Sequence, residues 1–553
     1  MRKYRVLPIL LTICLICATF STTITSATDS ASTQTDIKIT SEEKLYSTAT
    51  IDDNFTDDKV MVILSNAASL ASQDYNAFSF SEINCKKVTN YSQSTVDQVK
   101  MILSDETISA PYFVQSDGKD SPITSDIDLS SFYQYLCLEL AEPSKENVLA
   151  AIEILERRED VLYAGPNYIY TISNASVNTT YDNGDFGTGI PAAYSLTSTV
   201  PNDRYYSDQW AISQINLDDA WNISTSNSVV TIGILDTGID ADHPDIQGCV
   251  NETASRDCLS GYALAVSNVT DPNGHGTMVG GVIGATANNV IGVCGVSRNV
   301  ELISLRIADQ NRNSSSSAIM AALCYAHDNG IKIINMSLSY FVINQEIRHY
   351  LNNTYNGLVI CAAGNNSGNI DNTHVYPACH DFYNIISVGA STSYETRWVG
   401  SNYGEYCVDL FAPGAAVYST MSRSVCSTTN CEAFGYHVGY NYHADSGTSY
   451  AAPYVAGVAT LIMAKYPSLS IAEVKERILN SVDVSSAYIG YCSTNGRLNA
   501  YKALHNHSYT HRYDVVDTSG HNSFCACGVY TFEDHNFSEI GGLWVCSDCG
   551  FAY

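Results

Sequence analysis

The chain has 553 residues, and a single hydrophobic core rarely organises more than about 250 to 300 residues, so several domains are expected. Its 57 Asp and Glu outnumber its 28 Lys and Arg, which gives a formal net charge of −29. A surface this acidic repels nucleic acid and anionic membranes, and it excludes both as partners. The charge assigns no function by itself, because an acidic shell keeps any exported protein soluble.

The N-terminus has the layout of a secretory signal peptide. Three basic side chains in the first five residues precede an apolar run over residues 6–20, and a Ser/Thr-rich stretch follows. Cleavage is expected near Ala27, so residues 1–27 form the predicted signal peptide. We therefore expect a secreted, extracellular and monomeric protein with no membrane attachment after cleavage.

The chain contains 18 cysteines, which in an exported protein predict disulfides rather than free thiols. Two short spacings favour local bridges, one between Cys249 and Cys258 and one between Cys426 and Cys431.

Residues 28–200 are predicted to form a separate N-terminal region, with a folded α+β core at about 55–170. An amphipathic helix is expected after Ser144, whose side chain suits an N-cap. Residues 171–200 are polar, rich in glycine and without periodicity, and they are predicted to be a linker. Strands are predicted over 59–65, 132–142 and 161–170.

From residue 201 the pattern changes to apolar runs that alternate with helical segments. This pattern predicts an α/β fold, a doubly wound, mainly parallel sheet covered on both faces, over residues 201–504. Active sites in such sheets form at the carboxyl ends of the strands. Strands are expected over 229–235, 300–308, 331–339, 358–365 and 384–391, and helices over 314–330 and 344–357.

Residues 443–453, HADSGTSYAAP, contain two candidate chemistries. Asp445 in Asp-Ser-Gly and Asp236 in Asp-Thr-Gly together resemble the paired turns of an aspartic protease. That enzyme requires an all-β protein with two lobes, whereas a small-residue helix is predicted after Ser449, with Pro453 in its first turn. Asp445 is therefore expected to be an ordinary loop residue, and Ser449 the nucleophile.

A serine nucleophile needs a histidine to accept its proton and a carboxylate to orient that histidine. His275 lies at the start of a helix of small residues, where Gly274 and Gly276 permit close packing, and Asp236 ends a buried strand. Backbone N–H groups at the helix start after Ser449 suit an oxyanion, and Asn365 is placed to supply a second donor.

In this order, Asp236, His275, Asn365 and Ser449 lie in the motifs DTGID, HGT, AAGN and GTSYAAP. The chain therefore resembles the subtilisin-like serine proteases over residues 201–504. The resemblance implies a secreted serine endopeptidase that acts on protein or peptide substrates.

Two positions depart from the family pattern. Tyr450 stands where many relatives have Met, which is expected to alter the packing below the nucleophile. The substrate-pairing strand of the family commonly reads Ser-Leu-Gly, whereas this chain has Ser337, Leu338 and Ser339. The added side chain is expected to narrow the substrate cleft.

The N-terminal unit resembles the ferredoxin-like inhibitory propeptide of the same family, with an unrelated accessory domain as the alternative. The resemblance implies a zymogen that cleaves itself and is inhibited by its own propeptide.

The resemblance of residues 201–504 to the subtilisin-like proteases also implies a structural calcium site, matched here by Asp203, Asp245 and Asn289. The alternative is that these acids are merely solvated on an acidic surface.

Residues 505–553 form a Cys/His-rich tail with a weak two-copy repeat. Its cysteines either bind zinc together with a nearby histidine or form disulfides, and the tail is a candidate binding module in either case. The four tail cysteines are Cys525, Cys527, Cys546 and Cys549.

A pseudoenzyme that binds peptides in its cleft is the alternative to the assignment of the whole chain as an endopeptidase.

Overall fold

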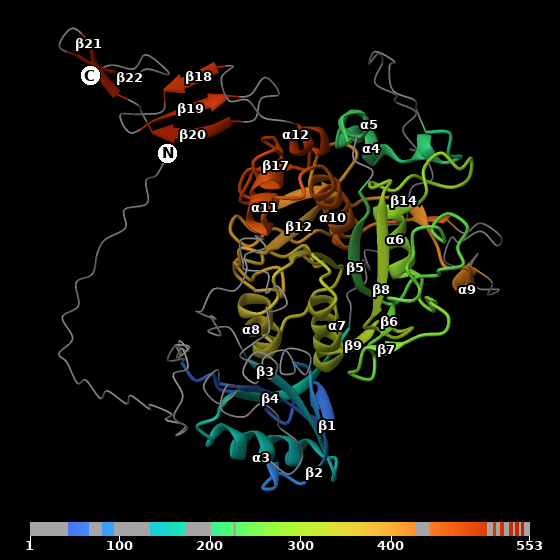
Figure 1. The fold of residues 1–553 in the computed structure, drawn as a ribbon, viewed down its shortest axis with the longest axis vertical. Coiled ribbons are helices and arrows are strands. Elements are labelled where there is room, and N and C mark those ends of the chain that lie inside the picture. The colour runs from blue at the N-terminus through green and yellow to red at the C-terminus, as the bar shows by residue number, and fades with distance from the viewer. Residues whose placement is uncertain are drawn as a thin grey trace, which may run out of the picture.

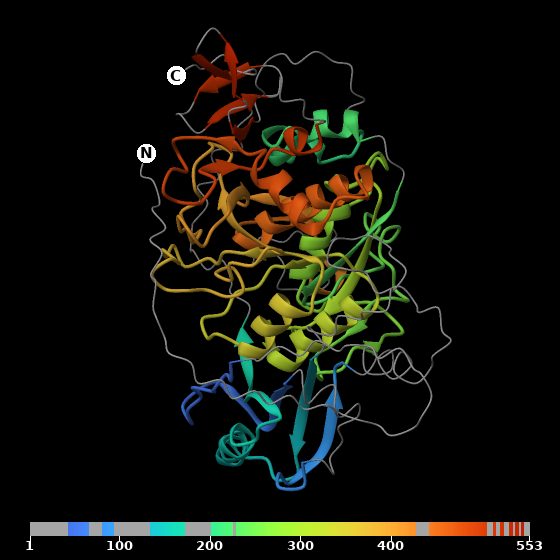
Figure 2. The same cartoon turned by 60° about the vertical axis from the view of Figure 1, so that its left-hand side comes forward.

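The computed structural model describes residues 43–65, 80–92, 133–171, 201–224, 228–426 and 442–505, and five short strands between residues 512 and 546. The predicted signal peptide and the predicted linker after Thr171 lie outside the described residues. In Figures 1 and 2 a small N-terminal sheet packs against one end of a large α/β body, and the tail strands lie at the other end.

The body is built on a ten-stranded sheet whose central strands are all parallel. These strands are short runs of Val, Ile and Leu, and both of their faces are buried, as expected of a parallel sheet. In sheet order the strands are β16 (Asp483–Val484), β17 (Gly496–Arg497), β13 (Leu410–Pro413), β12 (Ile385–Ser391), β11 (Leu358–Ala362), β10 (Ile333–Met336), β5 (Val230–Asp236), β8 (Val300–Arg306), β6 (Arg256–Asp257) and β7 (Leu264–Ala265).

Helices cover both faces of this sheet. Ile234 and Ile333 pack with α6 and α10 on one face, whereas Leu235 and Ile334 pack with α7 on the other. The fold is therefore the doubly wound α/β fold that the sequence predicts. The helices are η2 (Tyr206–Asp208), α4 (Trp210–Gln214), α5 (Leu217–Ile223), α6 (His275–Gly284), α7 (Ser316–Asp328), α8 (Gln345–Asn353), α9 (Arg423–Cys426), α10 (Thr448–Lys465), α11 (Ile471–Leu479) and α12 (Ala500–Leu504).

Besides the N-terminal sheet, three smaller groups of described strands lie outside the large sheet. A two-stranded ribbon runs beside α6, and the tail contributes a three-stranded and a two-stranded antiparallel sheet. Within the described residues no helix is long and apolar enough to cross a membrane. The strands are β14 (Val417–Thr420) and β15 (Tyr442–Asp445) in the ribbon, and β18 (Arg512–Val515), β19 (Gly520–Phe524), β20 (Tyr530–Asp534), β21 (Phe537–Ile540) and β22 (Leu543–Cys546) in the tail.

The N-terminal unit is an antiparallel sheet in the order β2-β3-β1-β4, with one described helix against it. As predicted, Ser144 caps that helix, because its side chain accepts a hydrogen bond from the amide of Asn147. Figure 1 shows the sheet between this helix and α7 and α8 of the body. The elements are β1 (Phe55–Leu64), β2 (Cys85–Asn90), β3 (Gln134–Leu140), α3 (Lys145–Glu156) and β4 (Val161–Thr171).

The sheet of the N-terminal unit continues into the body. Strand β4 pairs antiparallel with β9 (Asn313–Ser315), and Thr171 lies opposite Asn313. Beside this pairing, the side chain of Asn167 accepts a hydrogen bond of 2.8 Å from the amide of Ser317 in the first turn of α7. The two parts are thus joined by backbone and side-chain hydrogen bonds as well as by a shared apolar cluster.

A buried carboxyl lies at this junction. Glu346, in the first turn of α8, is 1% exposed, and neither of its oxygens has a hydrogen-bond partner among the described residues. Its surroundings include Tyr163, Tyr168 and Tyr170 of β4. Burial raises the pKa of Glu346 to about 8, and the neighbouring Asn344 side chain opposes only part of that shift.

The predicted position of Pro453 is wrong. The helix begins at Thr448, so Pro453 lies in the helix interior and not in the first turn. Its missing N–H leaves the carbonyl of Ser449 without the usual partner four residues on, and the Ser337 hydroxyl donates to that carbonyl instead, at 2.7 Å.

The predicted bridge between Cys249 and Cys258 is also wrong. The carbonyl of Cys249 accepts from Leu302 and the amide of Cys258 donates to Arg306, at positions four residues apart on β8. Four residues of a strand span about 13 Å, too far for a disulfide. The ten cysteines whose side chains are described are all free thiols. The predicted partner of Cys426, Cys431, lies outside the described residues.

The buried carboxyl makes a first prediction. Because the folded protein keeps Glu346 protonated up to about pH 8 while the unfolded chain ionises it in the ordinary carboxyl range, stability is lost as the pH rises between those values, by at most about 1.4 kcal/mol per pH unit. Glu346→Gln should therefore raise the unfolding midpoint by an amount that grows with pH and levels off above about pH 8. Thermal unfolding from pH 5 to 9 in a Ser449→Ala background tests this; an offset independent of pH contradicts it.

Candidate active site

The two polar side chains predicted to form a base and its orienting acid are in contact. His275 Nδ1 lies 2.7 Å from Asp236 Oδ1, and their side chains are 2% and 0% exposed. Asp236 is the last residue of β5 and His275 the first of α6, so the pair sits at the carboxyl end of a parallel strand. This contact fixes the imidazole by its Nδ1 side and leaves Nε2 for other chemistry.

The pair depends on a close approach of α6 to the loop after β5. A Cβ on Gly276 would lie 2.0 Å from the carbonyl oxygen of Gly238, so a side chain is excluded there. Gly274, the residue before the helix, has a φ of 94°, a conformation that favours glycine. The sequence pattern pointed to both Gly274 and Gly276.

A second buried carboxylate, Asp271, was not identified from the sequence. It accepts hydrogen bonds from the amides of Gly274 and Thr277 at 2.8 and 2.9 Å, and so caps α6. It also accepts from the Thr237 hydroxyl at 2.9 Å, which ties the start of α6 to the end of β5. Burial raises the pKa of Asp271. The available signal was an acid four residues before His275, the predicted start of the helix.

Ser449 is the second residue of α10 and is 4% exposed. Its hydroxyl donates to the carbonyl oxygen of Ser337 at 3.2 Å, and no hydrogen bond joins it to His275 in this structure. Together with the bond from the Ser337 hydroxyl to the Ser449 carbonyl, this makes a reciprocal link between α10 and the segment after β10.

Asn365 follows β11 and is oriented by the residue before the serine. Its Oδ1 accepts from both the amide and the hydroxyl of Thr448, at 2.9 and 3.0 Å. The Nδ2 group is therefore directed away from Thr448. Neither this group nor the amide N–H of Ser449 has a hydrogen-bond partner among the described residues. Two unengaged donors near the serine suit a developing negative charge.

The predicted substrate strand lies next to these groups. Ser337, Leu338 and Ser339 are all buried, and they follow β10 directly. A Cβ on Gly364 would be 3.4 Å from the Ser339 hydroxyl. The added side chain is thus directed toward the residue before Asn365.

The expectation for Asp445 is wrong. Asp445 ends β15 instead of lying in an open loop, and its Oδ2 accepts a hydrogen bond of 2.8 Å from the Tyr450 hydroxyl. The ring of Tyr450 in turn lies against His275, with 5.5 Å between the ring centroids. The sequence analysis noted the unusual Tyr450 but missed its hydrogen bond to Asp445. The two residues belong to different elements, β15 and α10, and the turn between these elements is what brings them into contact.

The three residues predicted to bind calcium are brought together. Asn289 Nδ2 donates to Asp245 Oδ1 at 2.6 Å, and Asp203 accepts from the amides of Asn288 and Asn289. Asp203 and Asp245 are 5% and 0% exposed. Burial, together with the nearby charge of Asp203, raises the pKa of Asp245 to about 6.

The loop beside these acids is strained. Alternate residues have positive φ, 62° at Asn288, 72° at Val290 and 58° at Gly292, and this conformation is unfavourable for a β-branched residue. A Cβ on Gly292 would lie 2.0 Å from Asp245 Oδ2. In the part of the chain that the structure describes, no group of three or more His, Cys, Asp or Glu is placed to hold a metal, so a cation here would need amide and carbonyl oxygens.

The predicted zinc cysteines in the tail cannot be placed. Cys525, Cys527 and Cys549 lie outside the described residues, and Cys546 is described only as the last residue of β22.

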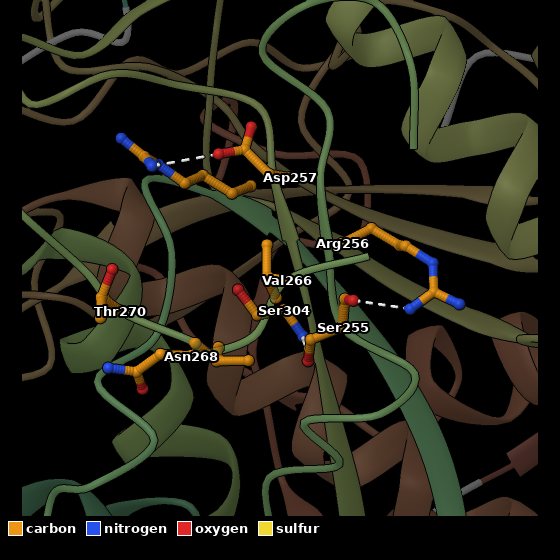
Figure 3. Close-up of a pocket in the computed structure, with 9 residues that line it drawn as sticks. Ser255, Arg256, Asp257, Val266, Asn268, Thr270 and Ser304 are labelled. Carbon is orange, nitrogen blue, oxygen red and sulfur yellow. Dashed lines mark hydrogen bonds and ion pairs between the residues drawn. The ribbon is translucent and has the colours of Figure 1, made fainter. Parts of the chain in front are cut away.

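A small cavity lies apart from the groups above. It encloses about 90 Å³ between β6, β8 and residues 266–270, and its lining contains none of the predicted site residues. In Figure 3 the side chains of Asn268, Thr270 and Ser304 line it. The space suits a few water molecules but no peptide.

Comparison with known proteins places this arrangement in a family. A sequence profile described as "Subtilase family" matches residues 227–520. The chain is 31% identical over 365 residues to the thermophilic serine proteinase of Bacillus sp. (strain AK1), covering 65% of this chain and 76% of the relative. It is 33% identical over 310 residues to thermitase of Thermoactinomyces vulgaris, covering 55% of this chain and 99% of thermitase. It is 36% identical over 252 residues to subtilisin DY of Bacillus licheniformis, covering 45% and 82%. The chain therefore belongs to the subtilase family, has its α/β fold, and is a serine-type endopeptidase.

Proposed function

We propose that the chain is a secreted zymogen whose peptidase activity depends on Asp236, His275 and Ser449, assisted by Asn365. The observation that carries the proposal is the buried 2.7 Å contact between His275 and Asp236 at the carboxyl end of β5. A buried histidine held on one edge by a carboxylate, near the N-terminus of a helix that carries a serine, is the arrangement that acyl transfer requires.

In the proposed mechanism the Ser449 hydroxyl leaves the Ser337 carbonyl and donates to His275 Nε2. Its Oγ then attacks the carbonyl carbon of the substrate, and the proton passes to His275. Asp236 accepts the hydrogen bond from Nδ1–H throughout and stabilises the charged imidazole. The imidazole next gives its proton to the departing amine, and water hydrolyses the acyl ester by the reverse proton path.

The oxyanion is assigned to the two unengaged donors, Asn365 Nδ2 and the amide N–H of Ser449. Both are fixed before reaction, Asn365 by Thr448 and Ser449 by α10, so little reorganisation is needed. The backbone of Ser337, Leu338 and Ser339 is assigned to pair with the substrate, with the Ser339 side chain narrowing the cleft.

We assign the N-terminal unit to an inhibitory propeptide. Its support is the continuity between β4 and β9, since the chain leaves β4 at Thr171 while already paired with the body. The domain division that we propose is a signal peptide at 1–27, a propeptide region at 28–200 with a linker at 171–200, a catalytic domain at 201–504 and a tail at 505–553. The zinc or disulfide chemistry of the tail remains a sequence prediction.

Calcium is the cation that fits the loop at 287–293. Asp203 and Asp245 would supply hard oxygen ligands, and Asn289 an amide oxygen once its side chain turns. Burial and the charge of Asp203 both oppose the ionisation of Asp245, which lies beside a strained loop, and a bound cation would stabilise the charged form of Asp245. Bound there, the ion would hold the segment with Asp203 to the body.

Processing gives the main test. Full-length wild type, purified after expression alone, should be recovered as two fragments cut between about Thr171 and Asp203. Ser449→Ala should remain one chain that has lost only the signal peptide, because the nucleophile is gone and one hydroxyl contributes little to the core. Intact-mass measurement and N-terminal sequencing check both outcomes. Identical cutting of both proteins, or of neither, contradicts self-processing.

The oxyanion donor gives a kinetic prediction. Asn365→Ala should lower kcat by about 10² or more and leave KM nearly fixed, since the donor acts only on the transition state. Steady-state kinetics on a peptide substrate measure both constants. A variant with the kcat of wild type removes Asn365 from the mechanism.

The cation site gives a stability prediction. EDTA should lower the unfolding midpoint of the Ser449→Ala protein, and added calcium should restore it, because an ion bound only by the folded state stabilises that state. Asp245→Ala should make the midpoint insensitive to calcium. Asp257→Ala, which removes a half-buried ion pair with Arg306 on the same sheet, is the control and should keep the calcium response. An unchanged midpoint in EDTA counts against the site.

A further inference from the structure

The first residue after the proposed nucleophile makes an aromatic contact with the proposed base. Tyr450 is 2% exposed, its ring centroid lies 5.5 Å from that of His275, and the ring planes are inclined by 50°. The imidazole of His275 is therefore held by Asp236 at one edge and flanked by an aromatic ring. A single hydrogen bond through Nδ1 leaves the imidazole free to tilt, and a neighbouring ring restricts that motion.

The Tyr450 ring is itself anchored at its far end. Its hydroxyl donates to Asp445 Oδ2 at 2.8 Å, and Asp445 Oδ1 accepts from the amide of Ser446 at 2.7 Å. Hydrogen bonds to a carboxylate are roughly twice as strong as neutral ones. The carboxylate of Asp445 is thus fixed by its own local hydrogen bond, and it in turn holds the Tyr450 hydroxyl.

Asp445 belongs to a frame that also carries the base. It pairs with Val417 across the ribbon of β14 and β15. The ribbon is bonded to α6, because the Ser419 hydroxyl donates to the Met278 carbonyl at 2.7 Å and the Thr420 hydroxyl to the Thr277 carbonyl at 2.8 Å. The contact between Tyr450 and Asp445 therefore completes a continuous series of contacts from α10 through β15 and β14 to α6. Ser449 lies on the first of these elements and His275 on the last.

We propose that Tyr450 is a positioning residue for His275, and that Asp445 acts through it by anchoring the Tyr450 hydroxyl. The proposal rests on the catalytic roles given above to Ser449 and His275. In this structure Ser449 Oγ points to the Ser337 carbonyl, so the imidazole must be held ready to receive it. A displacement of about 1 Å between reacting groups lowers the rate by up to about 10². A contact that fixes the position of the imidazole therefore affects kcat.

The test expresses four variants as the full-length chain and compares their kinetics after processing. Tyr450→Phe keeps the ring and removes the anchor, and Asp445→Ala removes the acceptor. Each should lower kcat by about tenfold and change KM by less than about twofold. Asp445→Asn keeps an oxygen acceptor and should lose only about threefold. The double variant Tyr450→Phe/Asp445→Ala should resemble the single variants, since both break the same contact.

Tyr454 provides the matched control. It is a buried tyrosine one turn further along α10, and its hydroxyl makes no hydrogen bond among the described residues. Tyr454→Phe should therefore keep the kcat of wild type. Unfolding midpoints of all variants separate a loss of positioning from a loss of fold, and the Asp445 pair keeps the test decisive if Tyr450→Phe does not fold.

Three results overturn the proposal. Wild-type kcat in Tyr450→Phe and Asp445→Ala removes the anchor from the mechanism, and additive losses in the double variant show that the two residues act separately. If Asp445→Asn falls as far as Asp445→Ala and shifts the pH profile of kcat/KM, the charge of Asp445 acts on His275 directly. An inactive wild type, or a wild type unaffected by Ser449→Ala, instead contradicts the proposed function.

Discussion

The close approach of α6 to the loop after β5 is the constraint on which the proposed catalytic geometry depends. It brings His275 onto Asp236, and it exists because Gly276 has no side chain where a Cβ would meet the carbonyl oxygen of Gly238. The cost is a carboxylate buried completely, with Oδ2 left without a partner among the described residues. Such a group lowers stability, and the network around Asp271 offsets this by fixing both elements that carry the pair.

Much of the body was predictable from the sequence because its signals are local. Continuous runs of Val, Ile and Leu between helical segments specify a parallel sheet buried on both faces. The strand that ends at Asp236 lies within one residue of its predicted ends, and the strand before Asn365 begins at the predicted residue and ends three residues early. Parallel strands also place their carboxyl ends along one edge. The motifs at His275 and Ser449, which are far apart in the chain, are therefore predicted to lie near the same edge of the sheet, although no direct contact between them can be inferred from the sequence.

The predictions that were wrong depend on tertiary position. The Ser337 hydroxyl allows Pro453 to lie deeper in α10 than a rule for the first turn permits. The spacing of Cys249 and Cys258 gave no indication that both would line one strand, at points too far apart to bridge. Asp445 had no role visible from the sequence, because its partner Tyr450 lies across a turn. The sequence analysis also did not predict that β9 continues the N-terminal sheet. That pairing joins segments more than 140 residues apart, as does the hydrogen bond from Ser317 to Asn167.

The interruption of α10 at Pro453 has a consequence for attempts to make this protein more robust. A designer who scores local propensity alone would replace that proline, since proline in a helix interior costs about 3 kcal/mol relative to alanine. The replacement would supply a new N–H at the rung where the helix now has none. That N–H would compete with the Ser337 hydroxyl for the carbonyl of Ser449, and the segment after β10 would lose one of its two attachments to the helix. Local helix propensity and the hydrogen bonding of Ser449 are thus opposed at this one position, and a choice made on propensity alone would disturb the segment that carries the proposed nucleophile.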